Sequence, residues 1–309
     1  MNFHSHVGRL PTAAVPDCTE ALKNIYDLVG AGDDYQFTYA PSRAHAISHV
    51  LYSYYFDEIT ETGRNHYLTI SGEDAPIVLT LDRLEKAGCF GKKCAYDEID
   101  RYITPRTGLV TLSWANTLTG VIHPIEKIAK ICQEKGVALH VDASPVIGKL
   151  SIQLRDLPID YLTIDQGVFT RPGIALGPLV CGEPLDPHAI LNLGARAKSL
   201  IENLDEVGCE GVRLRDIFER RLVEAIPSAK ILFADRERLP GISAVAFPSL
   251  HAELLAFHLH HRGIGASFGG GAYQTLENIL AGHEHASSAL SFCIQGDASE
   301  LILALQEIV

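Results

Sequence analysis

The sequence predicts an α/β protein: a large domain built on a three-layer, mostly parallel sheet, followed by a small C-terminal α+β domain. Two patterns support this fold class. In the middle of the chain, short β-branched and apolar runs alternate with stretches whose apolar residues recur at helical spacing, as a parallel sheet covered on both faces requires. After Pro227 the expected strands and helices follow one another more closely, which is typical of a small α+β unit.

The large domain is expected to contain buried strands at 66–71, 108–115, 137–143, 160–165 and 176–181. Between the second and the third of these, residues 124–132 carry apolar side chains at helical spacing. Pro124 lies near the start of this run and Gly136 just past its end, as is common at helix termini. The order of strand, helix and strand predicts a βαβ unit within the sheet.

The run 192–226 is expected to form one long helix, or two helices with a break near Gly208 and Gly211. Beyond it we expect strands at 230–234, 242–247, 264–268 and 289–294, and helices at 251–261 and 298–308. The large domain is therefore placed at 1–200, and the linking helix with the small domain at 201–309.

Composition and charge exclude several classes of protein. The net charge of −12, from 38 acidic and 26 basic residues, opposes a phosphate backbone, and no Lys/Arg-rich stripe is present, so no nucleic acid is expected. The longest apolar runs are far short of the roughly 20 residues that a membrane-spanning helix needs, so no membrane is expected. The first residues show no basic cluster followed by an apolar run, and the seven cysteines are scattered. We therefore expect a cytoplasmic protein with reduced thiols.

No metal site is expected. Cys89 and Cys94 are the only close pair of cysteines, and a second pair is missing. His258 and His261 share one face of a predicted helix, but they border its apolar stripe and lack further ligands. A serine hydrolase is also disfavoured, because the sequence contains no G-x-S-x-G turn.

The most informative local string is HVDASPVIGK at 140–149. It follows a predicted buried strand and places Asp142 at the carboxyl end of that strand, where ligands bind in α/β sheets. A carboxylate there suits a protonated ring nitrogen, but it also suits capping of the following segment. Taken alone, the string favours capping.

The string resembles the H-V-D-A-x-Q-x-x-G-K pattern of the cysteine desulfurase branch of the class V aminotransferases, enzymes of fold type I that use pyridoxal phosphate (PLP). The segments 28–38, 110–121 and 150–165 resemble that family in the same order. The resemblance implies a PLP site at the carboxyl edge of the sheet and a homodimer. The residues that it assigns to cofactor binding are Ser42, Asn116, Thr117, Asp142 and Thr163.

Several positions depart from the family pattern in the large domain. Where the family carries its Schiff-base lysine this chain has Val168, which can form no imine. Where the family stacks a histidine on the pyridine ring it has Asp74, an anion without an aromatic face. The glutamine that hydrogen-bonds the phenolic oxygen of PLP is replaced by Pro145. In the phosphate-binding turn, 39–43 reads YAPSR, in which Ser42 keeps a donor.

Two further replacements fall in the small domain. The segment 267–273, where the family has its mobile-loop cysteine, runs to Tyr273 without a thiol. Ser291 stands where an arginine of the family clamps the substrate carboxylate, so that bidentate contact is missing. Lys149 is the nearest substitute lysine, but it matches a family lysine outside the imine position and is expected to be structural.

These replacements lead to the hypothesis of a pseudoenzyme that lacks desulfurase and aminotransferase activity and has a regulatory or partner-binding role in iron–sulfur assembly. Its expected partners are a second copy of the chain and an iron–sulfur scaffold protein or an active desulfurase. We expect either no cofactor or PLP held without a covalent bond. Two alternatives stay open: a protein that binds PLP or a small acid non-covalently, and a PLP-family enzyme with altered chemistry.

Overall fold

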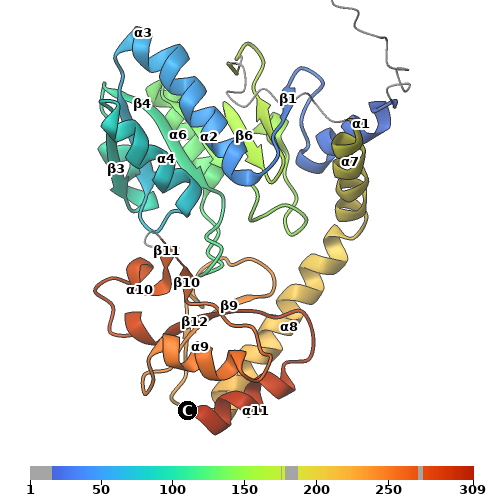
Figure 1. The fold of residues 1–309 in the computed structure, drawn as a ribbon, viewed down its shortest axis with the longest axis vertical. Helices are drawn as coiled ribbons and strands as arrows, with labels where there is room; N and C mark the ends of the chain where they lie inside the picture. The colour runs from blue at the N-terminus through green and yellow to red at the C-terminus, as the bar shows by residue number, and fades with distance from the viewer. Residues whose placement is uncertain (1–15, 175, 178–186, 271–273) are drawn as a thin grey trace, which may run out of the picture.

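The computed structural model describes residues 16–174, 176–177, 187–270 and 274–309 (Figure 1). Its larger sheet has seven strands in the order β1-β7-β6-β5-β4-β2-β3. The strands are β1 (Gln36–Tyr39), β2 (His66–Ile70), β3 (Phe90–Cys94), β4 (Thr107–Ser113), β5 (Ala138–Asp142), β6 (Tyr161–Ile164) and β7 (Gly167–Thr170). Strands β2 to β6 are parallel to one another, whereas β7 is antiparallel to both β6 and β1. The predicted mostly parallel sheet is confirmed.

Helices cover both faces of this sheet. They are α1 (Thr19–Val29), α2 (Arg43–Tyr54), α3 (Thr60–Thr62), α4 (Ala75–Lys86), α5 (Ile99–Tyr102), α6 (Ile125–Lys135) and α7 (Pro187–Glu202), with a π-helical turn η1 (Tyr55–Ile59) after α2 and short 3₁₀ turns η2 (Tyr96–Glu98) and η3 (Leu154–Asp156). One apolar cluster joins the sheet to α2 and α4 through Ile47, Val50, Leu51, Ile77 and Leu81. The other joins it to α1, α6 and α7 through Ile25, Val29, Ile125, Ile128 and Leu193. This makes the three layers that the sequence predicts.

Helix α6 shows why the predicted βαβ unit forms. Pro124 occupies its N-cap, and Gly136 ends it in the left-handed conformation with φ of 60°. A glycine adopts this conformation without the steric penalty that a Cβ atom brings. The helix buries Ile125, Ile128 and Cys132 against the sheet between β4 and β5.

A second, three-stranded antiparallel sheet follows, in the order β12-β9-β8. Its strands are β8 (Lys230–Leu232), β9 (Ile242–Ala246) and β12 (Ala289–Cys293). The remaining elements are α8 (Leu204–Ala225), α9 (Ala252–His260), β10 (Gly269–Gly270), β11 (Gln274–Thr275), α10 (Leu276–Ile279), the turn η4 (Ala286–Ser288) and α11 (Ser299–Ile308). Phe218 of α8 and Phe292 of β12 lie in the apolar cluster that α9 and α11 complete. Figure 1 shows α8 running from the large sheet to the small one.

Three strand predictions need correction. The expected strand at 264–268 forms only an isolated bridge, from Ser267 to Ser291. Of the expected strand at 176–181, residues 176 and 177 belong to no strand, and the rest lies outside the described residues. Strands β1, β3 and β7 were not expected: β1 and β3 are largely exposed or half-buried, and β7 is buried but has only four residues, which begin with a glycine.

The helix break predicted near Gly208 and Gly211 is wrong, since α7 ends at Glu202 and α8 begins at Leu204. Gly211 serves close packing instead, because a Cβ atom there would lie 2.8 Å from the Cβ atom of Pro240. The domain boundary at 200/201 stays a prediction. Within the described ranges, no helix is both long and apolar enough to cross a membrane.

Candidate functional site

The carboxyl edge of the large sheet gathers polar side chains from three neighbouring strands. Ser113 ends β4 and lies opposite Asp142, the last residue of β5, and Asp142 lies opposite Thr163 of β6. All three are at most 1% exposed. Because the strands are parallel, their carboxyl ends meet at one edge, which is where α/β sheets place ligands.

An arginine occupies the centre of this edge. Arg43 begins α2, and its Nε donates to Asp142 Oδ2 at 2.7 Å. One of its terminal nitrogens donates to Asp74 Oδ2 at 2.5 Å and lies 3.5 Å from Ser113 Oγ. Burial alone would lower the pKa of Arg43, but the adjacent carboxylates of Asp142 and Asp74 raise it above its ordinary value. The guanidinium is therefore charged and held between two buried carboxylates.

The Asp142 carboxylate has no acceptor position left for a ligand. Its Oδ2 atom accepts from Arg43, while Oδ1 accepts from Thr163 Oγ1 at 3.0 Å and from Ser144 Oγ at 2.7 Å. The side chain is fully buried. An ionised carboxylate accepts about four hydrogen bonds in all, and the Ser144 backbone nitrogen, 3.3 Å from Oδ1, is the fourth donor within the chain.

A second carboxylate, Glu73, supports the cluster from behind. Its Oε1 accepts from Ser113 Oγ at 2.5 Å and from the Asp74 backbone nitrogen at 2.7 Å, and its Oε2 accepts from the Ser113 backbone nitrogen at 2.8 Å. Burial, followed by the nearby charge of Asp74, raises the pKa of Glu73 to about 7. The Glu73 carboxyl group therefore titrates near neutral pH.

His140 extends the network beneath Asp142. Its Nδ1 lies 2.7 Å from Thr111 Oγ1, and its Nε2 lies 3.1 Å from Thr163 Oγ1. Burial lowers the pKa of His140 to about 4, although the charge of Asp142 acts in the opposite direction. The imidazole is therefore neutral and links two threonines to the edge.

The other residues that the resemblance assigns to cofactor binding have local roles. Thr117 Oγ1 donates to Asp74 Oδ1 at 3.4 Å. The side chain of Asn116 folds its own loop: it donates to the Gly72 carbonyl at 3.0 Å and accepts from the Thr119 backbone nitrogen at 2.8 Å. Ser42 caps α2 and accepts from the backbone nitrogen of its third residue. Asp142, Thr163 and Thr117 thus meet in one cluster, whereas Asn116 and Ser42 face their own turns.

Two of the positions at which this chain departs from the family pattern lie in strands of the described residues. Val168 lies in β7 between Thr38 and Thr163, is fully buried, and belongs to the apolar cluster under α2 and α4. Ser291 lies in β12, and its backbone exchanges two hydrogen bonds with Ser267. Tyr273 lies outside the described residues.

The side chain of Lys149, which the sequence predicts to be structural, is bonded to its own turn. Its Nζ donates to the Pro145 carbonyl at 3.1 Å, and burial lowers its pKa. Within the described ranges, the Lys149 amine makes no hydrogen bond or ion pair with Asp142, Asp74 or Arg43 at the carboxyl edge.

Sequence reasoning missed Arg43, Glu73 and Ser113. A signal was present for the first, because Asp74 adds a negative charge where the resembling family has a histidine, and Arg43 adds a positive charge in the turn at 39–43. Paired gains of opposite charge indicate contact, since a buried charge requires a partner.

PLP does not fit the residues present at this edge. Its aldehyde needs a lysine amine where Val168 lies in the core, and its ring nitrogen needs the Asp142 oxygen that Arg43 holds. Asp74 gives a carboxylate in place of an aromatic stacking partner.

A metal ion finds no ready site in the part of the chain that the structure describes. No group of three or more His, Cys, Asp or Glu side chains there is arranged to hold one. The ring of His261 packs on Phe257 with centroids 4.3 Å apart, so it contributes to a surface cluster of rings.

The comparisons with known proteins match this fold. The family described as aminotransferase class-V matches residues 1–165. The chain belongs to the aminotransferase class-V family. Among its relatives, this class-V chain is 28% identical over 279 residues to a cysteine desulfurase of Gluconacetobacter diazotrophicus, covering 81% of this chain and 68% of the relative. It is 30% identical over 192 residues to a cysteine desulfurase of Nostoc sp., covering 56% and 48%.

Solved structures show the same fold. A NifS-like protein superposes with a TM-score of 0.79 at 20% identity, covering 94% of this chain and 86% of that one. DndA from Streptomyces lividans superposes with a TM-score of 0.72 at 21% identity, covering 89% and 87%. The alignments with the two desulfurases above span between about half and two thirds of their length. The fold and family of this class-V chain are therefore shown.

Proposed function

We propose that this class-V protein is a non-catalytic member of the cysteine desulfurase branch, with a regulatory or partner-binding role in iron–sulfur assembly. The observation that carries the proposal is the position of Arg43, whose guanidinium is bound by Asp142 and Asp74 at the edge where the family holds its cofactor. A planar cation supplied by the chain itself takes the place of the protonated ring that Asp142 binds in the family.

The replaced positions support the same conclusion. A desulfurase needs an amine to carry the cofactor and a thiol to accept sulfur. Val168 supplies no amine, and the described part of the 267–273 segment contains no cysteine. Non-covalent binding of PLP is disfavoured as well, because Arg43 would have to leave two buried carboxylates uncompensated to admit the ring.

The proposed partners follow from the relatives, which are named cysteine desulfurases. We propose that the chain forms a homodimer and binds an iron–sulfur scaffold or an active desulfurase. We also propose that it acts in the cytoplasm. The six cysteines in the described ranges are all unpaired, which suits a reducing compartment.

The first experiment tests for the cofactor and the reaction. The protein is purified from cells supplied with pyridoxine, its absorbance spectrum is recorded, PLP is quantified by mass spectrometry, and sulfide release from L-cysteine is measured. We expect no pyridoxal absorbance, far less than one PLP per chain, and no sulfide above the buffer blank. Stoichiometric PLP or steady sulfide release would overturn the proposal.

A pair of variants makes this test sharper. Arg43→Met removes the guanidinium but restores no lysine, and we expect it to remain free of covalent PLP because residue 168 still supplies no amine. Val168→Lys in the Arg43→Met background adds the amine. A covalent PLP adduct in the single variant Arg43→Met would contradict our assignment of Val168 to the position of the Schiff-base lysine.

The second experiment tests the partner role. Sedimentation of the protein is measured alone and with an active desulfurase and scaffold protein from the same organism, and sulfide release by that desulfurase is measured with and without it. We expect a dimer, a complex, and a changed rate of sulfide release. A monomer that binds neither protein and leaves the rate unchanged contradicts the proposed role.

A further inference from the structure

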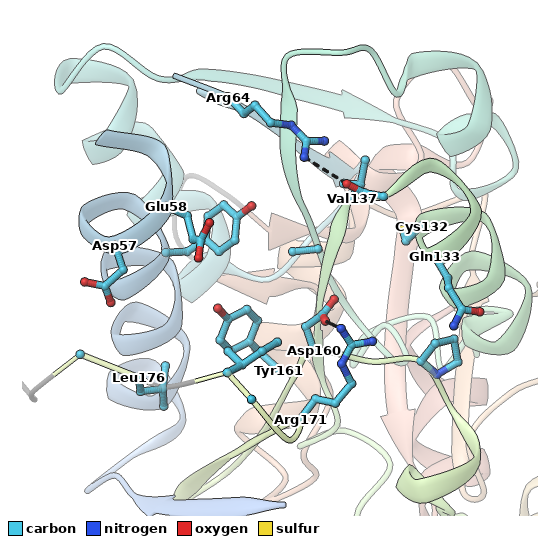
Figure 2. A pocket seen from close by; sticks show the side chains of 17 residues that line it. Asp57, Glu58, Arg64, Cys132, Gln133, Val137, Asp160, Tyr161, Arg171 and Leu176 are labelled. Atoms are coloured by element: carbon cyan, nitrogen blue, oxygen red, sulfur yellow. Dashed lines mark hydrogen bonds and ion pairs between the residues drawn. The ribbon is translucent and has the colours of Figure 1, made fainter. Parts of the chain in front are cut away.

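A cavity of about 700 Å³ lies at the opposite, amino edge of the large sheet (Figure 2). Its lining includes Ala138 and Tyr161, the first residues of β5 and β6. Strand β5 separates this edge from Asp142 by four residues, or about 13 Å at the usual rise of a strand. The cavity is therefore distinct from the carboxyl-edge cluster.

The two arginines of the cavity wall are already committed to partners. Arg64 donates to the carbonyls of Gly136 at 3.0 Å and Thr107 at 2.5 Å, so it caps the negative end of α6. Arg171 forms an ion pair with Asp160 at 2.8 Å, and the two lie together at the centre of Figure 2. Arg171 is therefore paired with a carboxylate, whereas Arg64 meets only neutral carbonyls and its buried Nε has no hydrogen-bond partner among the described residues.

The carboxylates on the facing wall have no such partners. Asp57 and Glu58 lie on the π-helical turn η1, are exposed, and form no ion pair with any other described residue. Figure 2 shows both on the helix that bounds one side of the cavity. π-Helical turns are rare and occur frequently at functional sites. These two carboxylates outnumber Arg64, the one lining arginine without a carboxylate partner among the described residues, so the balance of charge around this space is negative.

A buried hydroxyl lies between these carboxylates and Asp160. The side chain of Tyr161 is 5% exposed, and its hydroxyl makes no hydrogen bond with any described residue. The hydroxyl oxygen is nevertheless not fully enclosed by protein atoms, and its accessible surface faces the cavity that Tyr161 lines. Burial raises the pKa of Tyr161, and the charges of Asp160, Glu58 and Asp57 raise it further. The hydroxyl is thus a neutral donor and acceptor in a negative field.

The cavity favours an organic cation over a metal ion. The described acidic side chains form no group with metal-ligand spacing. Apolar side chains, including Val137 and Leu176, line the same space, which suits an aliphatic chain. The ring of Tyr161 meets that of Tyr54 edge to face with centroids 6.3 Å apart, and aromatic walls attract cations.

We propose that this cavity binds an organic cation, a primary ammonium group on an aliphatic chain. The ammonium donates to the Tyr161 hydroxyl, Asp57 and Glu58 supply the opposing charge, and the chain lies against Val137 and Leu176. This site is independent of the proposed partner role.

Isothermal titration with spermidine tests the proposal, with 1,4-butanediol as an uncharged probe. We expect saturable spermidine binding that weakens with added salt and no binding of the diol. The double variant Asp57→Asn/Glu58→Gln removes both charges and should weaken binding by about tenfold, equivalent to 1.4 kcal/mol. Tyr161→Phe removes one hydrogen bond, typically worth about 1 kcal/mol, and should weaken it by about fivefold.

Glu61→Gln is the matched control, because Glu61 is an exposed acid on the neighbouring α3 and does not line the cavity. It should leave spermidine affinity unchanged. Circular dichroism melts confirm that each variant is folded. The proposal is overturned by absence of saturable spermidine binding, by equal binding of the diol, or by equal losses in Glu61→Gln and Tyr161→Phe.

Discussion

The two edges of the large sheet, at either end of strands β5 and β6, carry polar groups in opposite states. At the carboxyl edge, Asp142 is fully buried and its oxygens are satisfied by Arg43, Thr163 and Ser144. At the amino edge of the sheet, the hydroxyl of Tyr161, the first residue of the neighbouring strand β6, has no hydrogen-bond partner among the described residues. The difference teaches where to look for function. Polar groups that satisfy one another contribute to stability, while polar groups left without partners are available to a ligand.

The largest expected effect is at the carboxyl end. Arg43→Met leaves Asp74 and Asp142 buried without a counter-charge, and we expect the free energy of unfolding to fall by about 4 kcal/mol. Urea denaturation followed by circular dichroism measures it. Arg155→Met is the control, because Arg155 is exposed and forms no ion pair with described residues, and it should change stability by less than about 0.5 kcal/mol. Equal losses in the two variants contradict the picture of a saturated edge.

Glu73 should give the carboxyl end a dependence on pH. Its pKa in the folded protein is about 7, above the ordinary 4.5, so the folded state binds its proton more tightly than the unfolded state. Its contribution to stability is therefore full below pH 4.5 and is lost as the pH rises to about 7. The full loss is about 3 kcal/mol.

The measurement is the difference in unfolding free energy between the wild type and Glu73→Gln across this pH range. The subtraction is needed because His140 has a pKa lowered to about 4, so its contribution to the unfolding free energy is lost as the pH falls below 6.5. This dependence is opposite in direction to that of Glu73. A difference that stays flat from pH 4.5 to pH 7 is incompatible with a raised pKa at Glu73.

An intermediate effect is expected at Asp160, the paired carboxylate of the amino end. Asp160→Asn removes the ion pair with Arg171 but keeps an acceptor for the Leu139 backbone nitrogen. Because Arg171 is partly exposed, the loss should be about 1 kcal/mol. Thermal or urea unfolding reports it, and a loss as large as that of Arg43→Met removes the contrast between the two ends.

The smallest effect on stability is expected from Tyr161→Phe. Its hydroxyl leaves no partner behind, so the free energy of unfolding should change by less than about 0.5 kcal/mol. The same variant is expected to weaken spermidine binding. A large loss of stability in urea would mean that the hydroxyl has a structural partner.

The central fold was predictable because its strands are buried runs. Strands β4, β5 and β6 are almost wholly enclosed, so their sequences are rich in apolar residues and carry few charges. Strand β3 was missed because four of its five residues are exposed and include Gly91, Lys92 and Lys93. The break between α7 and α8 was misplaced because Gly211 resembles a helix breaker, whereas it accommodates Pro240.

The candidate site was predictable only in part. The place of Asp142 followed from the end of a strand, but its partner Arg43 is separated from it by 99 residues, and Asp74 is separated from Arg43 by 31. No local pattern reports a contact over such distances. The amino-end cavity was not expected at all, since its lining comes from strand starts and a π-helical turn that carry no motif.

The Arg43 bridge also bears on how this sequence can evolve. Because Arg43 neutralises both Asp142 and Asp74, replacing any one of these three residues unbalances the buried charges and lowers stability. A cofactor pocket of the family type would require three simultaneous changes: a lysine at 168, an aromatic residue at 74 and the loss of Arg43. The Arg43 bridge therefore disfavours any stepwise sequence of substitutions that leads to such a pocket.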